Sequence, residues 1–240
     1  EATLDEGVER GKVTEAAAAD TLSRIRGTTD LAGAVEGADL VIEAVPEDLD
    51  LKQETLERVE THVDAAAILA SLSLTAIASA LERPTRAIGL HFFNPVHLMD
   101  LVEIVVAEQT DADTVAAARE FVEGIDRTPV EVTDSAGFAT SRLGAAQGAE
   151  AMRMLQEGVA SPRELDRAME LGYNHPMGPI ELGDVVGLDV RLDILEYLRE
   201  ELGERFRPPA NLRRKVRAGK LGRKTGEGFY VWADGEIVGT

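Results

Sequence analysis

The chain has 240 residues and no cysteine, and its 44 acidic and 25 basic side chains give a net charge of −19 at pH 7. The lack of cysteine excludes disulfides, thiolate metal sites and a cysteine nucleophile, and the negative charge argues against nucleic acid and anionic membranes as partners. No apolar run approaches the length of a membrane span and nothing resembles a signal peptide, so we expect a cytoplasmic protein.

The acidic surface is also poor in lysine. Only five of the basic residues are lysines, and the acidic residues are spread over the chain instead of forming a tail. Such a surface is typical of proteins that stay hydrated in concentrated salt, where the salt screens the repulsion between like charges. We therefore favour a halophilic protein over an ordinary acidic mesophilic one.

The first half of the chain alternates between helical and strand-like patterns. Thr14 is a suitable N-cap for the first helix. Strands that alternate with helices indicate a mostly parallel sheet in an α/β layer fold. The predicted strands are 40–45, 66–71, 87–90, 101–106 and 128–132, and the predicted helices are 14–26, 49–63, 75–81 and 111–125.

The second half is dominated by helical patterns. Ser161-Pro162, followed by Glu164, is a strong helix start. We therefore expect two domains, an α/β domain over residues 1–133 and an all-helical domain over residues 134–240. The predicted helices of the second domain are 139–156, 161–171, 178–202 and 210–218.

A histidine and a glutamate in neighbouring predicted strands form the candidate catalytic pair. His91 closes an apolar run, Glu103 lies inside the next one, and Asn94-Pro95 turns the chain between them. A carboxylate in a buried strand is costly unless it has a partner, and a carboxylate beside an imidazole makes that imidazole more basic. The two residues therefore suggest a general base with its orienting partner. A purely structural histidine at a strand end remains the alternative.

Five segments resemble the 3-hydroxyacyl-CoA dehydrogenase family, particularly its short-chain 3-hydroxybutyryl-CoA dehydrogenases. They occur in the order and at nearly the spacing of that family, over almost the whole chain. The segments are Asp39-Leu-Val-Ile-Glu-Ala-Val-Pro-Glu47, Gly89-Leu-His-Phe-Phe-Asn-Pro95, Asp134-Ser-Ala-Gly-Phe138, His175-Pro-Met-Gly-Pro179 and Gly222-Arg-Lys-Thr-Gly-Glu-Gly-Phe-Tyr230.

The resemblance implies a Rossmann domain that binds NAD and a helical domain that forms a homodimer and covers the active-site cleft. The implied reaction oxidises an (S)-3-hydroxyacyl-CoA to the 3-ketoacyl-CoA. In that reaction His91 matches the base that takes the C3 hydroxyl proton, and Glu103 matches the carboxylate that holds the base.

The resemblance also implies where NAD binds, at the carboxyl end of the strand that begins at Leu40. The implied contacts are Ala44, Val45, Glu47, Lys52 and Asn94. Nucleotides bind at this edge of doubly wound sheets. The alternative for Glu47 and Lys52 is an ion pair at a solvated helix start.

Three features depart from the family pattern. No Gly-x-Gly-x-x-Gly follows a strand, so the Rossmann domain is incomplete at its N-terminus. The chain is about four residues short after Ser71, where the family has a serine that contacts substrate, and Ser71 is a candidate substitute. Ser141 stands where the family has an asparagine, and its hydroxyl is the candidate to bond the thioester carbonyl of the substrate. We expect a longer natural polypeptide, with a nucleotide-binding segment before Glu1 and a short loop after Ser71.

Four scattered histidines without cysteine argue against a metal site. Two other functions stay open. One is a degenerate relative that binds acyl-CoA or has a structural role, and the other is a related dehydrogenase that acts on a free 3-hydroxy acid.

Overall fold

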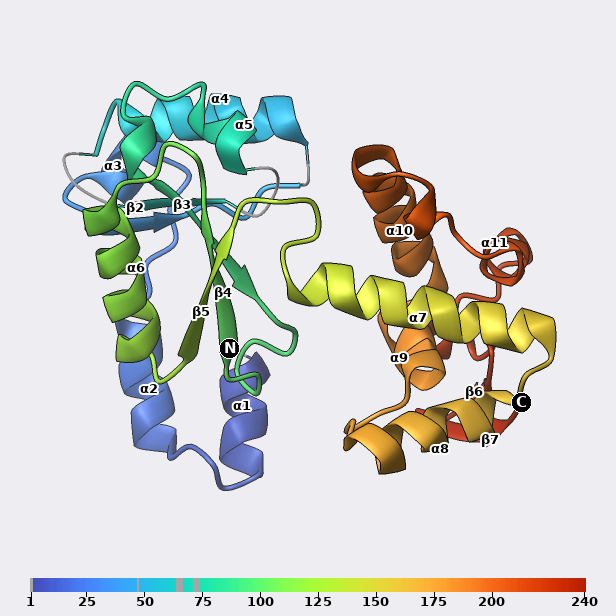
Figure 1. Ribbon diagram of the computed structural model, residues 1–240. Helices are drawn as coiled ribbons and strands as arrows, with labels where there is room; N and C mark the ends of the chain where they lie inside the picture. Colours follow the sequence, from blue (N-terminus) through green and yellow to red (C-terminus); the bar gives the residue numbers. More distant parts are fainter. Residues whose placement is uncertain (1, 47, 64–66, 71–73) are drawn as a thin grey trace.

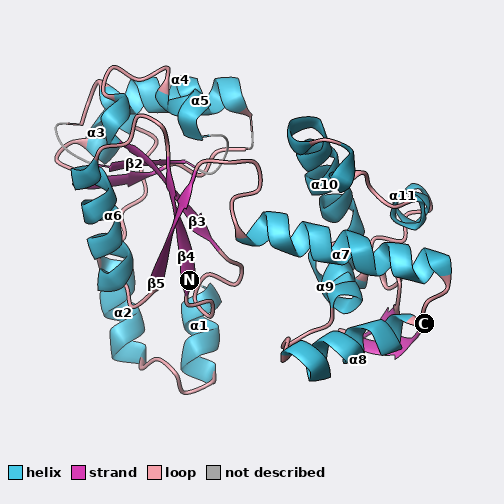
Figure 2. Cartoon of the chain, viewed as in Figure 1, coloured by secondary structure: helices cyan, strands magenta, loops and turns pink. Residues whose placement is uncertain are grey.

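The computed structural model describes residues 2–46, 48–63, 67–70 and 74–240 in two lobes (Figure 1). One lobe is built around a sheet, and the other consists of helices with a short hairpin (Figure 2). The chain passes between the lobes once, where the last strand of the sheet is followed by the long helix of the second lobe.

The sheet of the first lobe is mixed, because one neighbouring pair of its strands is antiparallel. The β3–β4 pair is antiparallel, whereas β1–β2, β2–β3 and β4–β5 are parallel. Parallel neighbours need a long crossover, usually a helix. The segment between β3 and β4 holds only a turn with a cis Asn94–Pro95 bond, so this pair is antiparallel within a sheet that is mostly parallel, as predicted. The strands, in sheet order, are β1 (Leu40–Ile42), β2 (Ala67–Ala70), β3 (Ala87–Phe92), β4 (Leu101–Val106) and β5 (Thr128–Thr133).

Helices cover both faces of this sheet, with α4 and α5 on one side and α6 on the other (Figure 1). Side chains cap several of them, as the predicted N-cap Thr14 does by accepting the N–H of Ala17. Asp111 caps α6 in the same way, through the N–H of Thr114. The helices of this lobe are α1 (Ala2–Glu9), α2 (Glu15–Ser23), α3 (Leu31–Val35), α4 (Leu49–Glu60), α5 (Leu74–Ala78), the 3-10 turn η1 (Pro84–Arg86) and α6 (Ala112–Gly124).

The alternation of side chains along β3 and β4 decides on which face of the sheet each side chain lies. Ala87 and Val105 pack in the core under α4 and α5, whereas Ile104 packs in the core under α6. Because successive strand side chains point to opposite faces, His91 has the parity of Ala87, and Glu103 has the parity of Val105. Both therefore belong to the α4–α5 face of the sheet.

The second lobe departs from the prediction at two points. Gly187, with φ of 107°, ends one helix and precedes another, so the predicted helix 178–202 is two helices. A hairpin turning at Asp234-Gly235, a common hairpin signal, makes the lobe not all-helical. Its elements are α7 (Thr140–Glu157), α8 (Pro162–Tyr173), α9 (Pro179–Val186), α10 (Leu188–Leu202), η2 (Glu204–Phe206), α11 (Ala210–Arg217), η3 (Arg223–Thr225), β6 (Val231–Ala233) and β7 (Glu236–Gly239).

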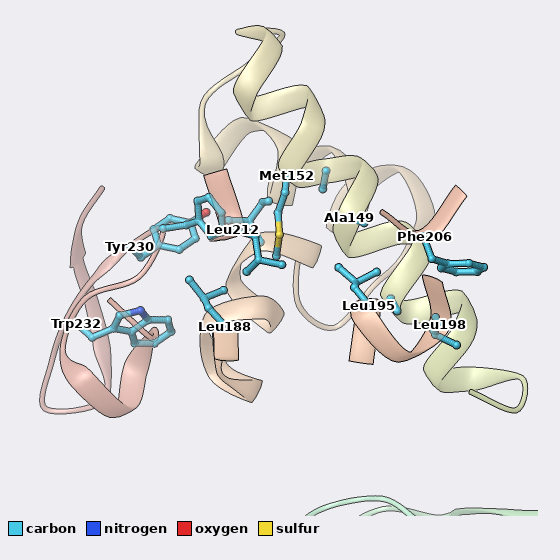
Figure 3. Close-up of a cluster of buried hydrophobic side chains, with 13 residues drawn as sticks. Ala149, Met152, Leu188, Leu195, Leu198, Phe206, Leu212, Tyr230 and Trp232 are labelled. Carbon is cyan, nitrogen blue, oxygen red and sulfur yellow. The ribbon is translucent and has the colours of Figure 1, made fainter. Parts of the chain in front are cut away.

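The core of the second lobe lies between α7, α9, α10 and the hairpin (Figure 3). Met152 of α7 and Leu188 and Leu195 of α10 are fully buried in it. Trp232 of β6 and Tyr230 close the core on the hairpin side (Figure 3). The middle turns of the long helix α7 are therefore packed into this core.

A buried carboxylate fastens the hairpin to α9. Asp184 is fully buried, and it accepts the N–H groups of Phe229 and Tyr230 at 2.9 Å and the indole N–H of Trp232 at 3.0 Å. A Cβ atom at Gly228 would lie 2.2 Å from Asp184 Oδ1, so only glycine fits there. The segment 222–230 therefore stabilises the fold of the second lobe through its contacts with Asp184.

We expect Asp184→Ala to lower the free energy of unfolding by about 3–5 kcal/mol, because three buried N–H groups lose their acceptor. Urea unfolding followed by circular dichroism measures this change. Asp193→Ala, at an exposed position of α10, is the control and should change stability by less than about 0.5 kcal/mol. A loss below about 1 kcal/mol for Asp184→Ala would show that the carboxylate does not hold the hairpin.

Candidate active site

The register of the antiparallel pair places His91 of β3 directly opposite Glu103 of β4. Directly opposite residues on one face of a sheet have their Cβ atoms about 5 Å apart, close enough for side-chain contact. His91 Nδ1 lies 2.7 Å from Glu103 Oε2. The two residues thus make the contact expected of neighbouring strands, while their catalytic roles stay predictions.

Glu103 is completely buried, and each of its carboxylate oxygens has two partners. Oε1 accepts the backbone N–H groups of Ala139 at 3.2 Å and Thr140 at 2.9 Å. Oε2 accepts the Thr140 hydroxyl at 2.8 Å and faces His91. Since α7 has no side-chain cap of its own, Glu103 satisfies free N–H groups at its start, where the helix dipole favours negative charge.

These donors keep Glu103 ionised. Burial alone would raise the pKa of this carboxyl, but the hydrogen bonds from His91 and from the backbone and hydroxyl of Thr140 outweigh burial and leave the pKa below its ordinary value. An ionised carboxylate only accepts hydrogen bonds, so a neutral His91 carries its proton on Nδ1. Nε2 of His91 then has a free lone pair and can accept a proton.

Two aromatic rings hold the imidazole on its other sides. The ring centroid of Phe93 lies 4.5 Å from that of His91, and the centroid of Phe138 lies 5.4 Å away. The His91 side chain is 24% exposed, so part of it remains open to a reactant. The imidazole is therefore fixed by Glu103 and the rings without being sealed off.

Three of the predicted cofactor residues lie where parallel strands of the sheet end. Ala44 and Val45 follow β1, and Asn94 lies just after β3. Because β1, β2 and β3 are parallel, their carboxyl ends meet at one edge of the sheet, which is where α/β sheets bind nucleotides. Ala44 and Asn94 are exposed there, so their placement fits contact with NAD.

Lys52 lies in a different environment from the one expected. Its side chain is fully buried, and its Nζ lies 2.8 Å from Oε2 of Glu43, which is itself 1% exposed. Glu43 also accepts the N–H of Val45 through Oε1. The alternative of an ion pair at a solvated helix start is therefore wrong for Lys52, and a direct contact between Lys52 and NAD stays a prediction.

Sequence reasoning missed Glu43, although it carried a visible signal. Glu43 follows Leu40-Val-Ile42, just as Glu103 interrupts an apolar run, and both glutamates are buried. Through Val45 and Lys52, Glu43 fixes the backbone at the edge where Ala44 is exposed. Glu43 is therefore a candidate support for the cofactor edge.

The predicted substrate residues are only partly placed. Ser141 follows Thr140 in the first turn of α7 and is half-buried, so it lies next to the carboxylate network. Ser71, and the predicted cofactor residue Glu47, lie outside the described residues. Thr140 was missed, because only the meeting of α7 with β4 reveals its contact with Glu103.

Within the ranges that the structure describes, no group of three histidine, aspartate or glutamate side chains could hold a metal ion. None of the described helices is both long and apolar enough to span a bilayer.

Comparisons with known proteins cover both lobes. Residues 1–135 match the family model of the 3-hydroxyacyl-CoA dehydrogenase NAD-binding domain, and residues 137–232 match that of the C-terminal domain. The chain is 42% identical over 229 residues to the probable 3-hydroxybutyryl-CoA dehydrogenase of Deinococcus radiodurans, a match that covers 93% of this chain and 82% of that protein. It is 41% identical over 228 residues to the 3-hydroxybutyryl-CoA dehydrogenase of Clostridioides difficile, covering 93% and 81%. The crystal structure of (S)-3-hydroxybutyryl-CoA dehydrogenase from Ralstonia eutropha is similar with a TM-score of 0.90 and 40% identity, over 97% of this chain and 84% of that one.

We expect Glu103→Gln to lower the free energy of unfolding at pH 7 by about 1–3 kcal/mol, because hydrogen bonds to a charged acceptor are lost. The folded-state pKa of Glu103 is lowered, so its stabilising contribution is present above the ordinary carboxyl pKa and disappears as pH falls through the folded value. The difference between wild type and variant should therefore shrink in acid.

Urea unfolding between pH 7 and acidic pH measures this difference. Glu108→Gln, which changes an exposed carboxylate just beyond β4, is the matched control and should show almost no difference at any pH. A stability gap for Glu103→Gln that stays constant into acid would contradict the lowered pKa.

Proposed function

The chain belongs to the 3-hydroxyacyl-CoA dehydrogenase family, whose NAD-dependent reaction oxidises a 3-hydroxyacyl-CoA to the 3-ketoacyl-CoA, and on this premise we propose that His91 is its general base and that a short-chain (S)-3-hydroxyacyl-CoA is its substrate. The observation that carries the proposal is the buried Glu103 carboxylate against Nδ1 of His91, beside the exposed edge of β1 and β3. The relatives are named 3-hydroxybutyryl-CoA dehydrogenases, and these names support a short acyl chain in the substrate.

The chemistry divides between cofactor and protein. NAD, when bound, supplies the acceptor for the hydride that leaves C3 of the substrate. Nε2 of His91 takes the proton of the C3 hydroxyl, and the Glu103 carboxylate stabilises the imidazolium that forms. The rings of Phe93 and Phe138 keep the imidazole oriented while its charge changes.

The remaining contacts are assigned by placement. We propose that Ala44, Val45 and Asn94 bind NAD at the exposed edge, where Glu43 and Lys52 support the backbone. Ser141, at the start of α7 beside the carboxylate network, is proposed to donate a hydrogen bond to the thioester carbonyl of the substrate. A dehydrogenase that acts on the free 3-hydroxy acid is the alternative, and the two differ in whether activity requires CoA.

We expect His91→Gln to lower kcat for NADH formation from (S)-3-hydroxybutyryl-CoA about 10²- to 10⁴-fold, with little change in KM, because the proton acceptor is lost. Absorbance of NADH measures the rate with the full-length protein. His62→Gln, which changes an exposed histidine just after α4, is the control and should keep full activity. Retained turnover in His91→Gln would reject His91 as the base, and activity on free 3-hydroxybutyrate alone would favour the alternative substrate class.

We further propose that the protein is a homodimer adapted to concentrated salt. Large apolar side chains lie exposed on the helical lobe, with Leu143 and Leu171 each 71% and Tyr173 73% exposed, and association of two copies would remove such side chains from water. The net charge of −19 supports adaptation to salt.

Between about 3 M and about 0.1 M KCl, we expect the melting temperature to fall and the dimer to weaken as the repulsion between acidic residues loses its screening. Thermal melts and sedimentation velocity at each salt concentration measure both effects. A monomer at all salt concentrations would reject the dimer, and a melting temperature independent of salt would reject the halophilic adaptation.

A further inference from the structure

The side chain of Thr140 makes a contact that pairing of His91 with Glu103 does not by itself require. Its hydroxyl lies 2.8 Å from Glu103 Oε2, the same oxygen that lies 2.7 Å from His91 Nδ1. Its backbone N–H donates to the other oxygen, Oε1, at 2.9 Å. Thr140 thus touches both oxygens of the carboxylate that faces the base.

This double contact restricts the rotation of the carboxylate. The terminal torsion of a glutamate side chain is broad and has no strong rotamer preference of its own, so hydrogen bonds must decide its orientation. The N–H groups of Ala139 and Thr140 anchor Oε1. Without the Thr140 hydroxyl, Oε2 would keep His91 as its hydrogen-bonding partner and would be free to shift with it.

We propose that Thr140 is a positioning residue for the general base, its hydroxyl fixing Glu103 Oε2 against His91 and taking up part of that oxygen's negative charge. The proposal rests on the proposed role of His91. Because the hydroxyl shares the oxygen with the imidazole, it weakens the pull of the carboxylate on the imidazolium while keeping the geometry fixed.

The groups that surround His91 let the Thr140 hydroxyl influence the imidazole through Glu103. The charged group in contact with His91 is Glu103 of β4, and the nearby rings of Phe93 and Phe138 carry no charge. From α7 only uncharged donors, of Ala139 and Thr140, reach the carboxylate. A change at Thr140 therefore reaches His91 through Oε2.

A merely structural role for Thr140, at the first residue of α7, makes a different prediction. Loss of the hydroxyl would then lower stability but would leave the pH dependence of catalysis and the state of the imidazole unchanged. Readouts other than stability are therefore needed to test positioning.

The test compares Thr140→Val, which removes the hydroxyl at nearly constant shape, with Thr140→Ser, which keeps it. We expect Thr140→Val to lower kcat about three- to tenfold with KM changed less than about twofold, since the base is less well held. The acid limb of kcat/KM should move to higher pH by about half a unit, because a less neutralised Oε2 favours the imidazolium. Thr140→Ser should restore both, and Thr133→Val, at an exposed position at the end of β5, is the matched control.

A second readout does not depend on activity. The ¹H and ¹⁵N chemical shifts of the His91 Nδ1–H group report the strength of its hydrogen bond to Glu103, and we expect Thr140→Val to shift them, because Oε2 no longer shares its charge with a hydroxyl, whereas Thr140→Ser keeps the wild-type values. Unchanged ring chemical shifts, kcat and acid limb in Thr140→Val would overturn the proposal, even if the melting temperature falls. Wild-type protein without turnover would reject the proposed function, while the ring shifts would still decide whether Thr140 fixes the imidazole.

Discussion

The buried carboxylate of Glu103 is the constraint on which the site depends. A charge removed from water is costly unless hydrogen-bond donors replace the water, and here no single element supplies them all. His91 comes from β3, whereas Ala139 and Thr140 come from the start of α7 in the other lobe. The charge is therefore satisfied only when both lobes are in place, and the same contact that orients the imidazole also ties the helical lobe to the sheet.

The topology of the sheet makes this arrangement possible. A helical crossover after β3 would have made its neighbour parallel and moved the next strand's residues away in sequence. The short connection through Asn94–Pro95 instead reverses the chain, so that residues twelve positions apart meet directly opposite one another. The carboxyl ends of β1 and β3 lie at the same edge of the sheet, with β2 between them. His91, the candidate base, thus lies at the carboxyl end of β3, the edge at which α/β sheets bind nucleotides.

Much of the fold and of the candidate site could be predicted from the sequence, because the sequence patterns that indicate them are local. The cost of Glu103 in an apolar strand pointed to His91, and the N-caps Thr14 and Ser161 marked helix starts that the structure contains. The break at Gly187 could not be inferred from an apolar pattern that continues through it. The contact of Thr140 depends on how two lobes meet, which no spacing along the chain encodes.

Two buried glutamates of the sheet lobe, Glu43 and Glu103, differ in their chemical roles because their hydrogen-bonding partners differ. Glu43 faces the amine of Lys52, which donates a hydrogen bond to the carboxylate. That pair holds the backbone of Val45 in place, because the other carboxylate oxygen accepts the Val45 N–H. Glu103 faces an imidazole, which in its neutral form donates from one nitrogen and accepts at the other. One buried carboxylate, Glu43, therefore supports the backbone at the edge of β1. The other, Glu103, orients the candidate base His91 at the end of β3.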